Sequence, residues 1–191
     1  MLPAMLNLID DTMLDTARLR IGLWYSRFQF RKSKDALLEF TDAVRRAKRA
    51  LVVLPRTPKD PASLQWVIRY LVDRFARGSL IIVARQEFSS WLAADKRYEI
   101  LVYGDADVGP WFTPDVGLLR KLKKSTFDIA IDLNPEFDLF SAFVCRASLA
   151  PVRVGFVKDN ADVFYNFQIQ VGKGAGIAGA YRSLLRCMEM F

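Results

Sequence analysis

The sequence predicts an α/β protein with a doubly wound, mostly parallel sheet that follows a helical N-terminal extension. Short apolar segments alternate with amphipathic helical segments from residue 50 onward. The clearest case spans residues 127–156, where a strand at 127–133, a helix at 137–148 and a strand at 152–156 follow one another. Such a βαβ unit has parallel strands and a right-handed crossover. The remaining segments extend the same sheet.

The extension is basic and rich in aromatic side chains. Residues 4–18 have one apolar helical face, whereas residues 20–31 fit neither the helical nor the strand period. A further helix is expected from Ser33, with an apolar stripe formed by Leu37, Phe40, Val44 and Ala47. We therefore divide the chain into an extension at residues 1–49 and an α/β domain at residues 50–191.

The domain starts with an apolar strand at residues 50–54. A helix begins at Pro61, with Asp60 as its N-cap, and Gly78 is expected to end it. The order of the strands in the sheet does not follow from the sequence. Further expected elements are a strand at 80–84, a short helix at 87–94, a strand at 98–103, a helix capped by Thr113 with Pro114 in its first turn, a loosely alternating segment at 163–171 and a helix at 177–190.

Composition excludes several classes of site. The chain has no histidine, which rules out His-based triads and typical zinc sites, and we expect neither a metal nor a cofactor. Cys145 and Cys187 lie in amphipathic patterns typical of buried thiols in a reducing compartment. We find no targeting segment and no apolar run long enough to span a membrane, so we expect a cytoplasmic protein.

The net charge of +7 is concentrated in one part of the chain. Residues 18–49 hold ten Lys or Arg against three Asp or Glu, and the charges of the flanking parts cancel. This favours a local patch over a generally basic surface.

Aromatic and basic side chains alternate within this patch. The segment has the composition of an element that docks on a membrane surface or a partner, and equally that of an arm packed on the sheet. We expect the extension to bind a protein partner or a second copy of the chain, or to lie on an anionic membrane surface. Nucleic acid is disfavoured because no recognised motif is present. The docking residues are Arg20, Trp24, Tyr25, Arg27, Phe28, Phe30, Arg31 and Lys32.

The order of several motifs resembles a known family. The motifs are RALVV at 49–53, Asp60, IRYL at 68–71, LIIVA at 80–84, YEILVY at 98–103, LLRKLKK directly before FDIAIDLN, and VRVGF at 152–156. This order resembles the N-terminal half of glycosyltransferase family 9, the bacterial heptosyltransferases of lipopolysaccharide synthesis. The likeness covers about residues 49–191.

The resemblance implies a Rossmann-like domain of GT-B type, in which the N-terminal domain binds the acceptor and a C-terminal domain binds the sugar nucleotide. Enzymes of the family work at the inner face of the membrane on a lipid-linked acceptor. The chain ends at the helix that would close the first domain, so we expect the donor domain to be absent.

The resemblance, together with the expected absence of a donor domain, implies two candidate functions. The first is a non-catalytic binding or scaffold subunit of a larger, membrane-associated complex. The alternative is a glycosyltransferase subunit that transfers a hexosyl or heptosyl group from a nucleotide donor to an envelope glycan or lipid, with a partner that supplies the donor domain.

Candidate site residues follow the ends of the strands. By the resemblance, Asp60 matches the aspartate proposed as the catalytic base, although Lys59 replaces the family's glycine; the alternative role for Asp60 is a helix cap. Arg56 and Lys59 are either phosphate ligands or solvated loop charges. Asp132 and Asn134 follow a strand at the edge where open α/β sheets bind ligands, or are ordinary polar residues at a strand end.

A glycine-rich segment precedes the last helix. Residues 174–179 match G-x-G-x-x-G, but neither the next strand nor the acidic residue of a dinucleotide site follows. The segment predicts a weak anion site at Lys173, Gly174 and Gly176, or alternatively a flexible turn.

Overall fold

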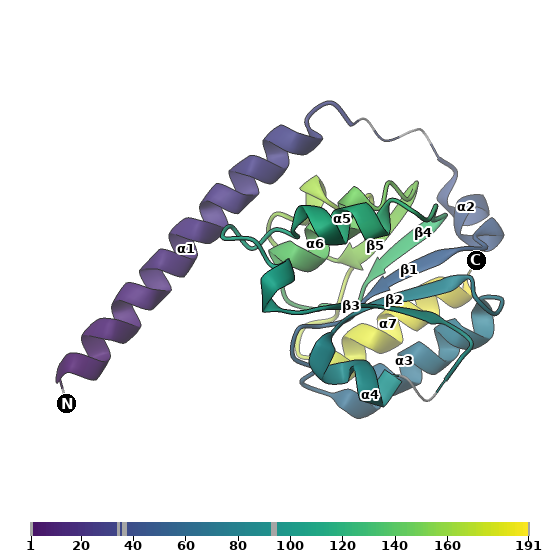
Figure 1. Ribbon diagram of the computed structural model, residues 1–191. Coiled ribbons are helices and arrows are strands. Elements are labelled where there is room, and N and C mark those ends of the chain that lie inside the picture. Colours follow the sequence, from purple (N-terminus) through teal and green to yellow (C-terminus); the bar gives the residue numbers. More distant parts are fainter. Residues whose placement is uncertain (1, 34, 36–37, 93–94, 191) are drawn as a thin grey trace.

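The computed structural model describes residues 2–33, 35, 38–92 and 95–190, with residues 2–12 described by their backbone alone. Six strands form one sheet in the order β3-β2-β1-β4-β5-β6, and every pair of neighbours is parallel (Figure 1). The expected doubly wound class is confirmed. The strands are β1 (Ala50–Val53), β2 (Leu80–Arg85), β3 (Glu99–Tyr103), β4 (Ile129–Asp132), β5 (Val152–Phe156) and β6 (Phe167–Ile169).

Helices cover both faces of the sheet (Figure 1). Leu51 and Val53 of β1 point into one core, whereas Ala50 and Val52 point into the other, as the alternation of a strand requires. One face packs against α2 (Phe40–Arg46), α3 (Pro61–Arg74), α4 (Ser89–Leu92) and α7 (Gly176–Glu189). The other packs against α5 (Val116–Leu122), α6 (Leu139–Ala147) and part of α1 (Leu2–Phe30). Short 3₁₀ turns occupy Gln86–Phe88, Asp105–Asp107 and Ala161–Val163.

The N-terminal extension differs from the prediction. Residues 20–31, which fitted no period, mostly continue α1 as one helix to Phe30. Apolar side chains on both faces of this helix conceal its period. The helix expected from Ser33 begins only at Phe40, and residues 34, 36 and 37 lie outside the described residues. The carbonyl of Ser33 instead accepts a hydrogen bond from Arg146.

Two other helix boundaries were also wrong. The helix expected at Thr113 begins at Val116, because the Asp115 carboxylate accepts hydrogen bonds from two backbone N–H groups of its first turn. Pro114 instead pairs with Val108 in an isolated antiparallel bridge. α3 ends at Arg74, while Gly78 forms a left-handed turn residue before β2. By contrast, Asp60 caps α3 ahead of Pro61 as predicted.

One carboxylate ties the link after α1 to the domain. Asp35 accepts hydrogen bonds from Arg146 at 2.6 Å and from Arg153 at 2.7 Å, and both guanidinium groups are buried. Burial acts to raise the pKa of Asp35, but the hydrogen bonds and charges of the two arginines outweigh it and lower that pKa. The folded state therefore favours the ionised carboxylate.

We predict that Asp35→Asn destabilises the protein by about 3 kcal/mol at neutral pH. This is the lower end for a broken buried pair, because the Asp35 side chain is 39% exposed while both arginines are buried. The contribution is complete above the unfolded pKa of about 3.9 and is lost as pH falls through the lower folded value. Urea unfolding of wild type and variant should therefore converge at acidic pH. Asp42→Asn, which breaks only surface pairs with Arg45 and Arg46, should cost less than about 1 kcal/mol.

Candidate functional site

The carboxyl ends of β1 and β4 define the candidate site. The chain runs from β1 outward through β2 to β3, and then returns to place β4 on the other side of β1. The two loops that leave β1 and β4 therefore diverge to opposite sides of this point. In open α/β sheets, this is the position at which ligands bind.

A cavity of about 280 Å³ opens between these two loops and the start of α7. Its wall combines apolar side chains with polar groups, which suits a small ligand that is only partly polar. The structure brings Arg56, Lys59 and Asn134, three of the predicted site residues, to this one cavity. The other lining residues are Pro55, Thr57, Pro135, Glu136, Phe137, Asp138, Ile177 and Tyr181.

Arg56 is the cation available to a ligand in this cavity. It is half-buried, and among the described residues it makes neither a hydrogen bond nor an ion pair. Lys59 donates to Glu136 at 2.5 Å, but both side chains are exposed, so this pair contributes little and can open. The Asp138 carboxylate already accepts a hydrogen bond from the Ser141 N–H, and this bond caps α6.

A buried network lies beside the cavity at the end of β4. Asp132 is fully buried and accepts hydrogen bonds from the Asn134 side chain at 2.6 Å, from Lys158 Nζ at 3.0 Å and from the Tyr165 hydroxyl. Lys158 also donates to the carbonyls of Asn134 and Glu136, at 2.7 and 3.2 Å. Asp132 and Lys158 therefore hold the backbone of the loop that forms one wall of the cavity.

The Tyr165 hydroxyl acts in this network as a donor. Burial and the charge of Asp132 raise the pKa of Tyr165 well above its usual value. The ring of Tyr165 lies directly over the backbone of Gly155. A Cβ at position 155 would approach the ring atoms to 2.8 Å, so this position in β5 requires glycine.

We predict that Gly155→Ala destabilises the protein by about 1–3 kcal/mol, because the added methyl group displaces the Tyr165 ring in a close-packed core. Gly172→Ala is the matched control, since Gly172 has no atom within 4 Å of its Cβ position and no left-handed backbone. Urea unfolding should separate the two variants. Equal stability of both would show that Tyr165 does not require glycine beneath it.

Asp60 stands next to the cavity at the start of α3 and acts as its N-cap. Its carboxylate accepts a hydrogen bond from the Ser63 N–H at 3.0 Å. Hydrogen bonds from the hydroxyl and backbone of Ser63, and then from the Ala62 backbone, hold the pKa of Asp60 below its usual range. The carboxylate is thus ionised but weakly basic.

The glycine-rich segment forms the turn before α7. Gly174 and Gly176 have φ values of 75° and 60°, and no atom lies near their Cβ positions, so backbone conformation is the reason for glycine here. Ala175 precedes α7 without a side-chain cap. Lys173 is exposed and does not line the cavity, which takes Ile177 and Tyr181 from the helix that follows.

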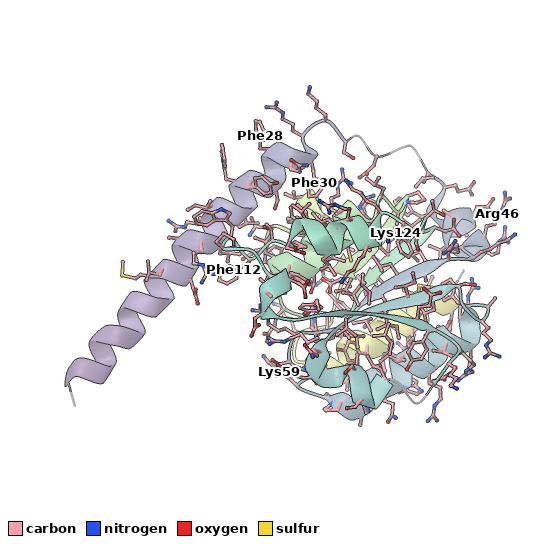
Figure 2. The ribbon with its side chains drawn as sticks, in the orientation of Figure 1. Phe28, Phe30, Arg46, Lys59, Phe112 and Lys124 are labelled. Carbon is pink, nitrogen blue, oxygen red and sulfur yellow. The ribbon has the colours of Figure 1, made fainter. Side chains whose placement is uncertain are left out.

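The predicted docking residues divide between two roles. Tyr25 and Phe30 contact Phe143 of α6, with ring centroids 6.2 and 4.9 Å apart, and Arg27 donates to Asn160. Trp24 and Phe28 instead stack on each other at the surface, and Arg31 lies over the Phe28 ring. Arg20 and Lys32 are exposed. Part of the segment is therefore a packed arm, and part is a free surface (Figure 2).

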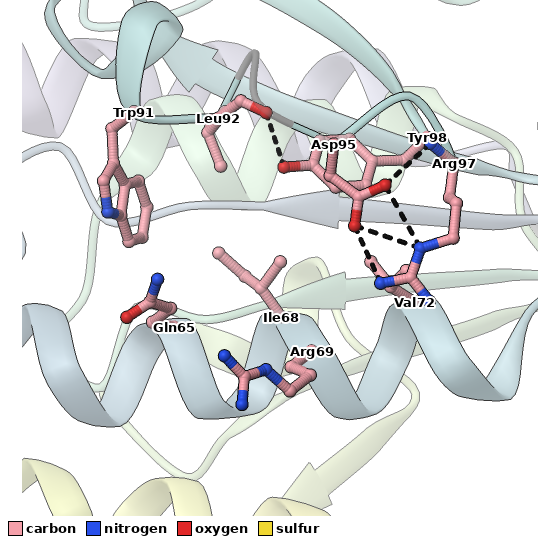
Figure 3. A pocket seen from close by; sticks show the side chains of 9 residues that line it. All are labelled: Gln65, Ile68, Arg69, Val72, Trp91, Leu92, Asp95, Arg97 and Tyr98. Carbon is pink, nitrogen blue, oxygen red and sulfur yellow. Dashed lines mark hydrogen bonds and ion pairs between the residues drawn. The ribbon is translucent and has the colours of Figure 1, made fainter.

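A second pocket of about 150 Å³ lies between α3 and the segment that leads into β3 (Figure 3). Trp91 lies across it from Gln65 and Arg69 of α3, and Asp95 and Arg97 form an ion pair at one end. None of the predicted site residues lines it. Its position at the side of the sheet makes it a weaker candidate than the cavity at the strand ends.

Sequence reasoning missed several residues of this region. No sequence motif pointed to three of them. Lys158 and Tyr165 complete the hydrogen-bond network around Asp132. Tyr181 lines the cavity and donates a hydrogen bond to the Leu133 carbonyl. One signal was present, namely Asp132, a charged residue at the end of the otherwise apolar strand β4. A charge buried in this way requires a partner.

Solved structures resemble this fold. A glycosyl transferase family 9 structure from Veillonella parvula DSM 2008 matches with a TM-score of 0.55 and 14% identity, over 75% of this chain and 42% of that one. The chain shares the α/β fold of the matched part of this glycosyltransferase structure. The E. coli heptosyltransferase WaaC, solved with ADP, matches with a TM-score of 0.54 and 14% identity, over 73% of this chain and 46% of that one.

The chain spans less than half the length of these two structures. No family model and no curated protein matches the sequence. The motifs that resemble family 9 fall in order on β1, α3, β2, β3, α5, β4 and β5, so the similar parts are the framework of the fold. Among the described residues, no helix is long and apolar enough to cross a membrane.

Proposed function

We propose that this chain is a family 9-like binding module, which holds an anionic sugar in the cavity between β1 and β4 and does not transfer sugar by itself. The observation that carries the proposal is the unpaired Arg56 in a cavity at the point where the strand order reverses. A guanidinium in such a place suits a phosphate or carboxylate, which it can bind in bidentate fashion.

The rest of the cavity supports a sugar-sized ligand. Phe137 and Ile177 give an apolar wall, while Asn134 and Thr57 offer groups that can bond to hydroxyls. The pair of Lys59 and Glu136 lies on the surface of the two loops, where a second anionic group can displace the glutamate. The likeness to glycosyltransferase structures is consistent with a sugar, although it establishes the fold alone.

The weak basicity of Asp60 supports a binding role over a catalytic one. A general base works best when its pKa lies near the operating pH, whereas the capping hydrogen bonds move the pKa of Asp60 in the opposite direction. Sugar transfer also requires that donor and acceptor are fixed together in one cleft. We extend the proposal to a cytoplasmic location, since Cys145 and Cys187 are free thiols. We also extend it to a subunit of a larger complex, since α1 keeps the large apolar side chains of Trp24 and Phe28 exposed.

We predict that titration calorimetry detects binding of glucose 1-phosphate and galacturonic acid but not of neutral glucose. Arg56→Ala should weaken binding at least tenfold, because a charge-assisted hydrogen bond contributes about 1.5–3 kcal/mol. Arg182→Ala, which removes an exposed arginine on the second turn of α7, is the matched control and should leave affinity unchanged. Equal binding of glucose and its phosphate would contradict the proposal.

A transferase subunit is the second candidate, favoured by the position of Asp60 beside the cavity. Asparagine also caps helices but cannot act as a base, so two variants separate the roles. On the binding proposal, Asp60→Asn leaves the melting temperature nearly unchanged and Asp60→Ala lowers it. With a sugar nucleotide and a copurified donor-domain partner, loss of transfer in Asp60→Asn alongside a normal melting temperature would establish the catalytic role instead.

A further inference from the structure

α1 packs on the domain by one face only. Leu19, Leu23 and Phe30 contact the core around α6, and Ser26 is fully buried. Gly22 touches the domain so closely that a Cβ there would collide with the Trp111 carbonyl and lie 2.6 Å from Leu139. This face is therefore fixed on the domain.

The opposite face carries an exposed apolar stripe. Its residues are three or four apart and so lie along one side of the helix, about half a turn from Gly22 and Ser26. Trp24 is 67% exposed and Phe28 is 49% exposed, and their rings stack with centroids 6.0 Å apart. In Figure 2, Phe28 lies on the outer side of α1 and Phe30 on the side of the domain. The stripe consists of Leu14, Ala17, Ile21, Trp24 and Phe28.

The N-terminal half of α1 extends beyond the domain altogether (Figure 1). All side chains described between Met13 and Ala17 are exposed. Helices in water take most of their stability from the packing of an apolar face, and the exposed apolar side chains Met13 and Leu14 in this half are not packed on the domain. A partner along the stripe would supply this packing.

The charges along α1 indicate which partner fits. Residues 1–17 contain three acidic and no basic residues, whereas residues 18–32 contain five basic and no acidic ones. A second α1 in antiparallel orientation places the acidic half of each helix beside the basic half of the other, and also opposes the two helix dipoles. An anionic membrane surface would attract one half and repel the other.

We propose that the stripe on α1 binds the same stripe of a second copy of this chain, in a two-fold antiparallel helix pair. Such an interface is self-complementary, as closed dimers require. The small Ala17 leaves room for the large Trp24 across the pair. Because each domain lies on the opposite face of its own α1, the two domains lie outside the pair and do not collide. The proposal does not depend on what the cavity binds.

The first test is the molar mass of the full chain in solution. Sedimentation equilibrium at micromolar concentration should give twice the 21.8 kDa of one chain. Ile21→Glu and Trp24→Glu should each raise the dissociation constant at least tenfold, since each places a charge in the apolar interface. Gln29→Glu adds the same charge to an exposed position outside the stripe and should leave the dimer intact. Circular dichroism checks that every variant is folded.

If the stripe does not bind a second copy of the chain, these experiments give different results. A wild-type monomer at these concentrations would overturn the proposal. Flotation of that monomer with phosphatidylglycerol vesicles, lost in Trp24→Glu, would assign the stripe to a membrane surface instead.

Orientation needs its own measurement. In a Cys187→Ser background, a spin label on Gln29→Cys should give a distance between the two labels of roughly 20 Å or more, since each residue adds 1.5 Å along an antiparallel pair. In a parallel pair the two labels lie level along the axis, so a distance below roughly 20 Å would show a parallel pair and overturn the antiparallel arrangement.

Discussion

The buried carboxylate of Asp132 is the interaction on which the site depends. Transfer of an ionised carboxylate from water to the protein interior without partners costs many kcal/mol of free energy. The buried position of Asp132 at the end of β4 therefore depends on its hydrogen bonds from Lys158, Tyr165 and Asn134. The same contacts fix the loop after β4, and Tyr165 in turn dictates glycine at position 155. One charge thus sets the conformation of a cavity wall while its own oxygens remain occupied by protein groups.

Features that depend on local sequence rules were predictable from the sequence. Asp60 and Pro61 indicated the start of α3, and continuous apolar segments indicated the buried strands. The network around Asp132 was not predictable, because Lys158 approaches it only through the crossover from β4 to β5. The cavity likewise needed the strand order, which no local pattern encodes. In α1, two apolar faces erased the period that reveals an amphipathic helix.

The cavity and the stripe on α1 belong to different parts of the molecule, and different forces govern them. The cavity offers one unpaired cation within a rigid frame, which favours selection of an anionic ligand. The stripe offers apolar area on a helix whose other face packs on the domain at Gly22, and the link that follows this helix is held by the Asp35 pairs. The chain can therefore form an assembly without a change in the geometry of its ligand site.

The position of β4 beside β1 also has a consequence for the order of folding. Ala50 pairs with Ile129, so this contact closes a long loop that contains β2, β3 and three helices. Closure of such a loop costs entropy before any pairing energy is gained, and non-local parallel pairing is slow. β1, β2 and β3 can associate as the chain emerges, but the two loops that line the cavity meet only when β4 arrives, and Ile177 and Tyr181 of α7 complete the lining after that. Ligand binding therefore reports on the last stage of folding, and a ligand in that cavity favours the fully assembled sheet over any earlier intermediate.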